Sequence, residues 1–115
     1  MNYDLCLHMD SPDPALLRLT LANAANYMKG LPGEHFQLVI VANGPGVRHF
    51  SKANTEGASL AAPLQAKGLR ILLCANALAA NDMDADSLWP GCEVVPAGLV
   101  EIVRLQRAGF AYIKP

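Results

Sequence analysis

The sequence predicts an α/β protein built on a five-stranded parallel sheet. Short apolar runs alternate with helical patterns from one end of the chain to the other, which is typical of repeated βαβ units. Residues 36–42 are apolar at nearly every position, as a strand covered on both faces must be. The chain has 115 residues, the length of one domain, and we expect residues 1–115 to form it.

The first part of the chain supplies two strands with a helix between them. Residues 3–8 are the first predicted strand. Asp13 is a natural N-cap and Pro14 suits the first helical position. An apolar stripe at helical spacing then extends the helix to about Lys29, and Gly30 follows as its cap. Residues 36–42 form the second strand.

Two alternatives remain open for the next helix. Residues 43–47 have the composition of a loop, and a helix is expected around residues 57–67. Pro63 removes a backbone donor and clashes with the preceding turn, so this helix is either kinked or begins only near Ala61. Residues 69–74 are the third predicted strand, and a short helix starts at Asn76.

The last third of the chain repeats the pattern. Residues 93–95 are predicted as a brief fourth strand, a helix runs from Gly98 through Ala108, and residues 110–113 form the fifth strand. The helix has four residues that share a face: Leu99, Ile102, Val103 and Gln106.

Composition narrows the possible partners. Hydrophobic residues make up 52% of the chain and charged ones 17%, against about 25% in a typical domain, so apolar surface is left for a subunit interface and we expect a homo-oligomer. The net charge of −1 and nine scattered Lys and Arg residues give no footprint for nucleic acid or an anionic membrane. No apolar run reaches the length of a membrane span. Three cysteines and no signal-like start favour the cytoplasm and no disulfide framework.

The candidate functional residues share one predicted place, the edge where parallel strands end. Ligands in open α/β sheets usually bind at the carboxyl ends of the strands. The residues that we expect there are His8, Asn43, Gly44, Gly46, Cys74 and Asn76.

Cys74 is the strongest candidate for chemistry. It ends a strand and precedes a helix, whose first amides can hold a thiolate or persulfide anion. The structural alternative is a small buried hydrophobe that completes the sheet. Cys6 lies within a strand and is expected in the core, and Cys92 follows Pro90-Gly91 in a predicted surface turn.

Two histidines are candidates for a base or a ligand contact near Cys74. His8 ends the first strand at the same edge, and His49 lies in the loop after the second strand; each can equally be a plain hydrogen-bonding residue. His35 precedes a strand at the opposite edge and is set aside. Gly44 and Gly46 let backbone N–H groups approach a small anion, although a tight turn explains them as well.

We expect no metal and no cofactor. Spacings such as C-x-x-C or H-x-x-x-H are absent, and the aspartates at 82, 84 and 86 lack the glycine and distal glutamate of a calcium loop. The glycines at 44 and 46 do not continue into a dinucleotide fingerprint, because His49 stands where a third glycine is needed.

Several short motifs, taken in order, extend over the whole chain. They are Asn43-Gly44-Pro45-Gly46-Val47; the strand from Gly68-Leu69 to Cys74 with Asn76-Ala77-Leu78 after it; Leu88-Trp89-Pro90-Gly91; Val94-Val95-Pro96-Ala97-Gly98; Glu101 with Arg104-Leu105-Gln106; and Tyr112-Ile113-Lys114-Pro115. With this order and spacing the chain resembles the DsrE/DsrF-like family of small sulfur-relay proteins, in its short, poorly characterised branch.

The resemblance implies a three-layer α/β/α sandwich with strand order 4-3-2-1-5 that assembles into trimers or hexamers. It also implies that Cys74 is the sulfur-carrying cysteine, which receives sulfane sulfur as a persulfide and passes it to a partner protein. Two hypotheses therefore stand: a sulfurtransferase-like carrier that uses Cys74, with Asn43, Gly44 or Asn76 orienting the sulfur, and a non-catalytic oligomeric module that binds a small ligand while Cys74 is structural. A cysteine hydrolase lacks a base near Cys74 in the sequence and is a minor third option.

Overall fold

A single parallel sheet organises the molecule. The computed structural model describes residues 2–115, and its five strands are β1 (Leu5–Met9), β2 (Leu38–Ala42), β3 (Arg70–Cys74), β4 (Glu93–Val95) and β5 (Ala111–Ile113). They lie side by side in the order β4-β3-β2-β1-β5, and every neighbouring pair is parallel. The predicted α/β class and strand order are confirmed.

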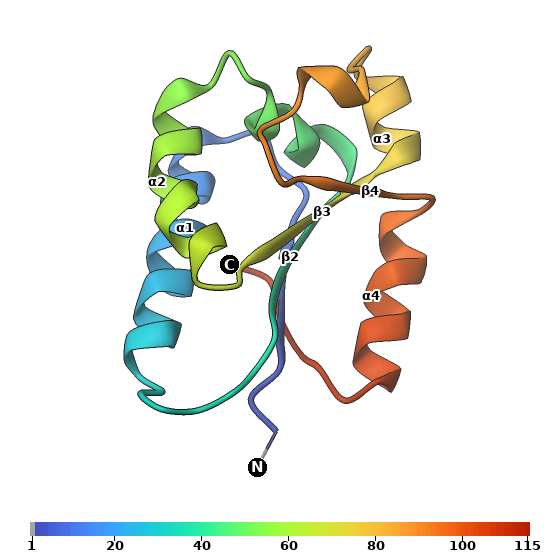
Figure 1. Ribbon diagram of the computed structural model, residues 1–115. Helices are drawn as coiled ribbons and strands as arrows, with labels where there is room; N and C mark the ends of the chain where they lie inside the picture. The colour runs from blue at the N-terminus through green and yellow to red at the C-terminus, as the bar shows by residue number, and fades with distance from the viewer. Residues whose placement is uncertain (1) are drawn as a thin grey trace.

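Helices cover both faces of this sheet (Figure 1). Helices α1 (Pro14–Lys29) and α2 (Thr55–Ala66) lie on one face, and α4 (Gly98–Arg107) lies on the other. Helix α3 (Ala75–Ala80) and the short 3-10 helices η1 (Gly44–Phe50) and η2 (Ala85–Ser87) occupy the end where the strands finish. Within residues 2–115, no helix combines the length and apolarity that crossing a bilayer requires.

Successive side chains along each strand point to opposite faces of the sheet, and each face packs in its own hydrophobic layer. All five residues of β1 and all five of β2 are buried, which explains why the sequence of β2 shows no polar alternation. Leu5 and Leu7 belong to the core layer that also holds the buried residues of α1 and α2, whereas Cys6 packs in the layer with Ile102 and Leu105 of α4. Burial on both faces therefore fixes which side of the sheet each strand residue serves.

The start of α1 follows its sequence signals. Asp13 is the N-cap, and its carboxylate accepts a hydrogen bond of 2.9 Å from the backbone N–H of Ala15. Pro14 occupies the first turn, where its missing N–H leaves no bond unmade, and Gly30 follows the last helical residue. These predictions are confirmed.

Helix α2 begins earlier than the sequence suggested. It starts at Thr55 because the side chain of Asn54 caps it, accepting from the N–H of Gly57 at 3.1 Å. Pro63 lies inside the helix, so, of the two alternatives left open by the sequence, the start near Ala61 is wrong. The capping asparagine, rather than the proline, determines where this helix begins.

Helix α4 presents a different face to the sheet from the one predicted. Ile102 and Leu105 are buried, whereas Leu99 is 61% exposed and Val103 is 47% exposed. Apolar residues at several neighbouring positions allow more than one stripe in a helix of ten residues, and contact with the sheet selects the one through Ile102 and Leu105. The remaining apolar side chains of α4 face outward.

Candidate functional site

Cys74 lies where β3 ends and α3 begins. It is the last residue of β3 and the N-cap of α3, with an extended backbone conformation (φ −69°, ψ 120°). Its side chain is 6% exposed and makes no capping hydrogen bond to the amides of α3, a helix of only six residues. The resting thiol is therefore not held by those amides, and their binding of a thiolate or persulfide anion stays a prediction.

A cavity of about 310 Å³ opens at Cys74. The residues that line it come from the end of β2, the start of α3 and the start of α4: Asn43, Gly44, Cys74, Asn76, Ala77, Ala97, Gly98 and Leu99. Four of the predicted site residues, Asn43, Gly44, Cys74 and Asn76, are thus brought together around one cavity. Its walls are otherwise apolar, so the Asn43 and Asn76 amides are its polar side-chain groups.

Gly98 explains why the cavity fits so closely around Cys74. A Cβ atom at Gly98 would lie 3.1 Å from the Cβ of Asn43 and 3.3 Å from the Cβ of Cys74. The first turn of α4 therefore rests directly on both side chains, an approach that only glycine permits without displacement. In the sequence, Gly98 marks only the start of a predicted helix, and nothing indicated its contact with Cys74.

His8 reaches this cavity indirectly, through Asn43. Its Nε2 lies 2.7 Å from Oδ1 of Asn43, and its Nδ1 lies 2.6 Å from the hydroxyl oxygen of Tyr112. The imidazole is 7% exposed, and both of its nitrogens are occupied by these partners. Tyr112, on β5, is a residue that the sequence reasoning missed, since strand pairing between β1 and β5 brings it to His8 from 104 positions away.

The loop after β2 is tied to α3 by side-chain hydrogen bonds. Nε of Arg48 donates to Oδ1 of Asn81 at 2.6 Å, and Nδ2 of Asn81 donates to the carbonyl oxygen of Ala77 at 2.7 Å. Gly44, at the cavity, adopts a positive φ of 52°. The segment predicted as a loop is the 3-10 helix η1, and Asn81 holds it against α3.

Gly46 and His49 do not line the Cys74 cavity. A Cβ at Gly46 would lie 2.6 Å from the carbonyl oxygen of Met9, so this glycine allows η1 to pack on the end of β1. Nε2 of His49 donates to the carbonyl oxygen of Ser11 at 2.7 Å, and the ring is buried. Neither residue therefore shares a cavity with Cys74.

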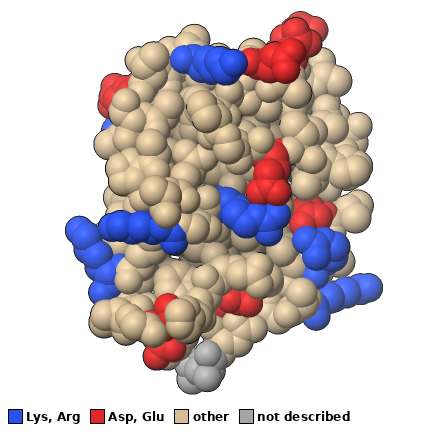
Figure 2. All heavy atoms as spheres, viewed as in Figure 1, with Lys and Arg blue, Asp and Glu red and all other residues tan. Residues whose placement is uncertain are grey.

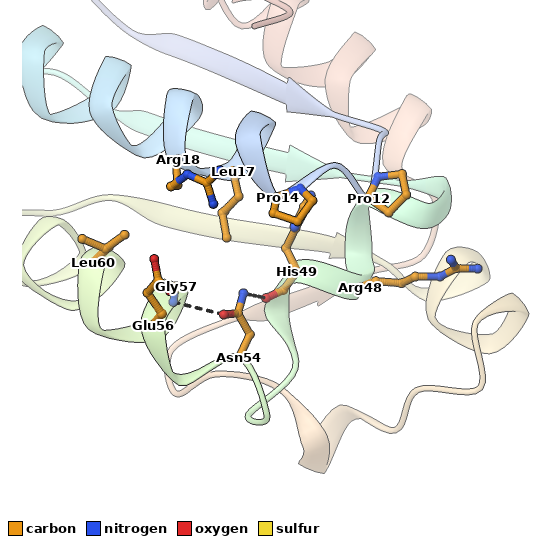
Figure 3. A pocket seen from close by; sticks show the side chains of 10 residues that line it. All are labelled: Pro12, Pro14, Leu17, Arg18, Arg48, His49, Asn54, Glu56, Gly57 and Leu60. Atoms are coloured by element: carbon orange, nitrogen blue, oxygen red, sulfur yellow. Dashed lines mark hydrogen bonds between the residues drawn. The ribbon is translucent and has the colours of Figure 1, made fainter.

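His49 instead lines a second cavity, of about 360 Å³, between the starts of α1 and α2 (Figure 3). Asn54 closes one side, since its Nδ2 donates to the carbonyl oxygen of His49 at 2.9 Å while its Oδ1 caps α2. Arg48 also lines this cavity, and its guanidinium extends toward α3, where its Nε donates to Asn81. The second cavity contains none of the cysteines.

The other two cysteines are poorly suited to act as nucleophiles. Cys6 is fully buried in the sheet, and burial raises the pKa of its thiol to about 11, with a smaller effect from the Glu101 carboxylate. Burial likewise raises the pKa of Cys92 to about 12, with Glu93 adding to it. Both groups stay protonated at neutral pH, and a protonated thiol is a weak nucleophile.

Charged side chains are dispersed over the molecule, and on the face in Figure 2 blue and red groups lie next to each other. Lys114 pairs with Asp10 at 2.8 Å near the strand ends, and its hydrogen bond lowers the pKa of the Asp10 carboxyl. Among residues 2–115, no three His, Cys, Asp or Glu side chains gather closely enough to hold a metal ion.

Fold and site together define a small α/β protein with a parallel sheet of order 4-3-2-1-5 and a cysteine-lined cavity at the carboxyl ends of its strands. The DsrE/DsrF-like family model matches residues 6–115, so the chain belongs to the DsrE/DsrF-like family. The family suggests a role in sulfur relay in general.

One solved structure is very similar. It is a protein of unknown function, MTH1491, from Methanobacterium thermoautotrophicum, with 34% sequence identity and a TM-score of 0.91 over 99% of this chain and 100% of that chain. No curated protein matches the chain.

Proposed function

We propose that this protein is a sulfur carrier that holds sulfane sulfur as a persulfide on Cys74. The Cys74 thiolate attacks the outer sulfur of a donor R–S–SH, a new sulfur–sulfur bond forms on Cys74, and the donor leaves as the thiolate R–S⁻. An acceptor thiolate then attacks the outer sulfur of the Cys74 persulfide, takes it, and releases Cys74 as a thiolate. Each step exchanges one sulfur–sulfur bond for another, so no external oxidant or reductant is needed.

One observation carries the proposal: Cys74 is the cysteine that lines a cavity at the carboxyl ends of the strands. The cavity has room for a sulfane group, and the amides of Asn43 and Asn76 border it. The raised pKa values of Cys6 and Cys92 make those thiols poor competitors. Membership of a family linked to sulfur relay supports the same chemistry.

The test is sulfur loading followed by intact mass. Purified protein is incubated with thiosulfate, polysulfide or a low-molecular-weight persulfide, with Cys74→Ser and Cys92→Ser prepared alongside. We expect the wild-type chain and Cys92→Ser to gain the mass of one sulfur atom and Cys74→Ser to gain nothing. A gain that is equal in wild type and Cys74→Ser contradicts the proposal.

A second candidate is a non-catalytic module that binds a small ligand at the same cavity. It is favoured by the low exposure of Cys74 and by the packing of this residue in the core layer of α1 and α2. In that case Cys74 contributes packing alone, and no sulfur is taken up from any of the three donors. Uptake that depends on Cys74 therefore separates the two functions.

Self-association is part of the proposal, as a trimer or hexamer. Among residues 2–115, eight large hydrophobic residues are well exposed, and six of them lie on β4, α4 and β5: Val94, Leu99, Val100, Val103, Tyr112 and Ile113. Burial of these side chains against a second copy would remove them from water. A donor or acceptor protein is the other partner, and the three free cysteines fit a reducing compartment such as the cytoplasm.

A further inference from the structure

Four polar side chains form a row across the sheet toward the cavity. Tyr112, His8, Asn43 and Cys74 belong to, or directly follow, the neighbouring strands β5, β1, β2 and β3. Tyr112 pairs in register with Cys6, and Asn43 and Cys74 come one residue after the registered pair of Ala42 and Leu73.

Tyr112, His8 and Asn43 belong to the face that α4 covers. Cys6 and Val41 pack in the layer beneath α4, and residues two positions apart in a strand point the same way, so His8 and Asn43 share this face. Cys74 packs in the other core layer, but its Cβ lies next to Gly98 at the start of α4. The row therefore connects the edge strand β5 to the cavity along one face.

The hydrogen bonds in this row have a definite direction. Oδ1 of Asn43 can only accept, so Nε2 of His8 carries the proton in that 2.7 Å contact. In a neutral imidazole Nδ1 is then an acceptor, and the Tyr112 hydroxyl donates to it at 2.6 Å. The Tyr112 hydroxyl thus donates a hydrogen bond to His8, and His8 donates one to Asn43.

The consequence falls on the amide nitrogen of Asn43. With Oδ1 bound to His8, Nδ2 faces away from the imidazole, and within residues 2–115 it has no protein partner. Asn43 lines the Cys74 cavity, and its Cβ lies against the same point of α4 as the Cβ of Cys74. The Nδ2 donor of Asn43 is therefore left for a bound group at the cavity that Cys74 also lines.

We propose that Tyr112 and His8 are positioning residues that hold the Asn43 amide with its N–H group toward the cavity, which selects anionic sulfane sulfur such as hydropersulfide and polysulfide anions. This inference rests on the proposed function of Cys74. An anionic sulfur accepts the Asn43 hydrogen bond, and bonds to charged groups are the stronger ones. A rotated amide would present its oxygen to the anion and repel it.

The test compares sulfur loading on Cys74 in three variants with matched controls. Tyr112→Phe removes only the hydroxyl, and Asn43→Asp replaces the N–H donor by oxygen at the same shape. Tyr3→Phe and Asn26→Asp are controls away from the row. We expect loading from polysulfide to fall about tenfold in Asn43→Asp and about threefold in Tyr112→Phe, as loss of a charged and of a neutral hydrogen bond predicts. Loading in His8→Gln should fall by at least as much as in Tyr112→Phe.

A spectroscopic signature separates positioning from mere packing. The ¹⁵N shifts of His8 should show the proton on Nε2 in the wild-type chain, and a mixture of tautomers in Tyr112→Phe, because Nδ1 has then lost its donor. Loading and His8 shifts that are both unchanged in Tyr112→Phe would overturn the inference.

If Cys74 takes up no sulfur at all, the proposed function is wrong, but the positioning role of Tyr112 and His8 can still be tested. Alkylation of Cys74 by iodoacetate, an anionic reagent, is then measured in the same variants. A slower reaction in Asn43→Asp and Tyr112→Phe than in the two controls supports the positioning row, and equal rates overturn it.

Discussion

At the scale of single residues, the glycine at the start of α4 controls the space around Cys74. The Cβ that Gly98 lacks would stand 3.1 Å from one side chain and 3.3 Å from another, and both would have to give by a few tenths of an ångström. The size of the cavity therefore depends on the absence of one methyl group.

Gly98→Ala should close part of this cavity and slow reagents that reach Cys74. We expect alkylation of Cys74 by iodoacetamide to fall severalfold, with a loss of about 1 kcal/mol in the free energy of unfolding from overpacking. Peptide mapping after timed alkylation measures the first, and urea unfolding measures the second. Gly30→Ala is the matched control, since a Cβ there meets only ordinary contacts. An unchanged alkylation rate in Gly98→Ala would show that reagents approach Cys74 by another route.

The two cysteines with raised pKa values make stability fall at alkaline pH. Their thiols ionise near pH 11 and 12 in the folded chain but near the ordinary value of 9.0 when unfolded. The unfolded chain therefore loses these protons first, so this contribution is complete below about pH 9 and is lost as pH rises. Between about pH 9 and pH 11 the free energy of unfolding should drop, and the drop should be smaller in Cys92→Ser. An identical drop in Cys92→Ser would assign the effect to other groups.

At the scale of elements, each helix and strand end is fixed by a few specific groups. The cap of α1 was visible in the sequence because Asp13 stands directly before a proline. The cap of α2 was not recognised: the expected helix around residues 57–67 was left with a possible start near Ala61 because of Pro63, whereas Asn54 accepts from the N–H of Gly57 and starts the helix at Thr55. A proline inside a helix, such as Pro63, therefore does not show where the helix starts, whereas a capping side chain does.

Asp13→Ala should destabilise the protein by about 1 kcal/mol, because the N–H of Ala15 loses its acceptor. Urea unfolding at neutral pH measures the change. Asp86→Ala, which removes an exposed carboxylate that makes no side-chain hydrogen bond in residues 2–115, should stay near wild type. Equal effects of the two substitutions would mean that the loss of charge, and not of the cap, is responsible.

The edge strand β4 is joined to β3 by an ion pair. Both Nε and Nη2 of Arg70 donate to the carboxylate of Glu93 at 2.9 Å, and these hydrogen bonds lower the pKa of Glu93. A lowered folded pKa stabilises the protein above the unfolded value of 4.5, and this stabilisation is lost as pH falls through the folded pKa.

Glu93→Gln should therefore cost about 0.2–1 kcal/mol at neutral pH, since both side chains are almost half exposed and solvent screens the pair. The difference from wild type should disappear as pH falls below the folded pKa of Glu93. Urea unfolding across this range checks it, with Glu34→Gln as an exposed control. A difference that persists in acid would point to packing instead of charge.

At the scale of the whole molecule, the two faces of the sheet differ in how completely helices cover them. Two helices, α1 and α2, cover one side, and α4 alone covers the other (Figure 1). On the α4 side several apolar side chains are exposed. The exposed apolar surface that the composition predicted therefore lies mainly on the α4 side of the molecule. Its use as an interface between copies of the chain stays a prediction.

Val100→Glu and Val103→Glu should reduce the molar mass of the particle in solution to that of one chain. These residues are exposed on α4 and lie outside the lining of the Cys74 cavity, so the fold should be kept. Light scattering after gel filtration measures the mass, and circular dichroism checks the fold. Leu19→Glu, on the outer side of α1, is the control. An unchanged assembly in both α4 variants would place the interface elsewhere.

The sequence was sufficient for the class, the strand order through family resemblance, and the edge at which the candidate residues meet. It was not sufficient for the site itself. Asn43 and Cys74 share a cavity because β2 and β3 are neighbours, while His49 turns to Ser11 and joins another cavity. The family resemblance implied that β1 and β5 are neighbours, but the contact between Tyr112 and His8 depends on the register of this pair, which no local pattern encodes.

The pairing of β1 with β5 also has a consequence for the order of folding. His8 and Tyr112 are separated by 104 positions, so an emerging nascent chain contains the histidine long before its tyrosine. Until β5 is synthesised, one edge of β1 has no neighbouring strand to bond its backbone amides. Such an unpaired edge is a site where incomplete chains can aggregate. Ribosome-bound fragments that stop before Ala111 should therefore bind chaperones more than full-length chains do. The site at Cys74 should be completed last, because Tyr112 lies on β5.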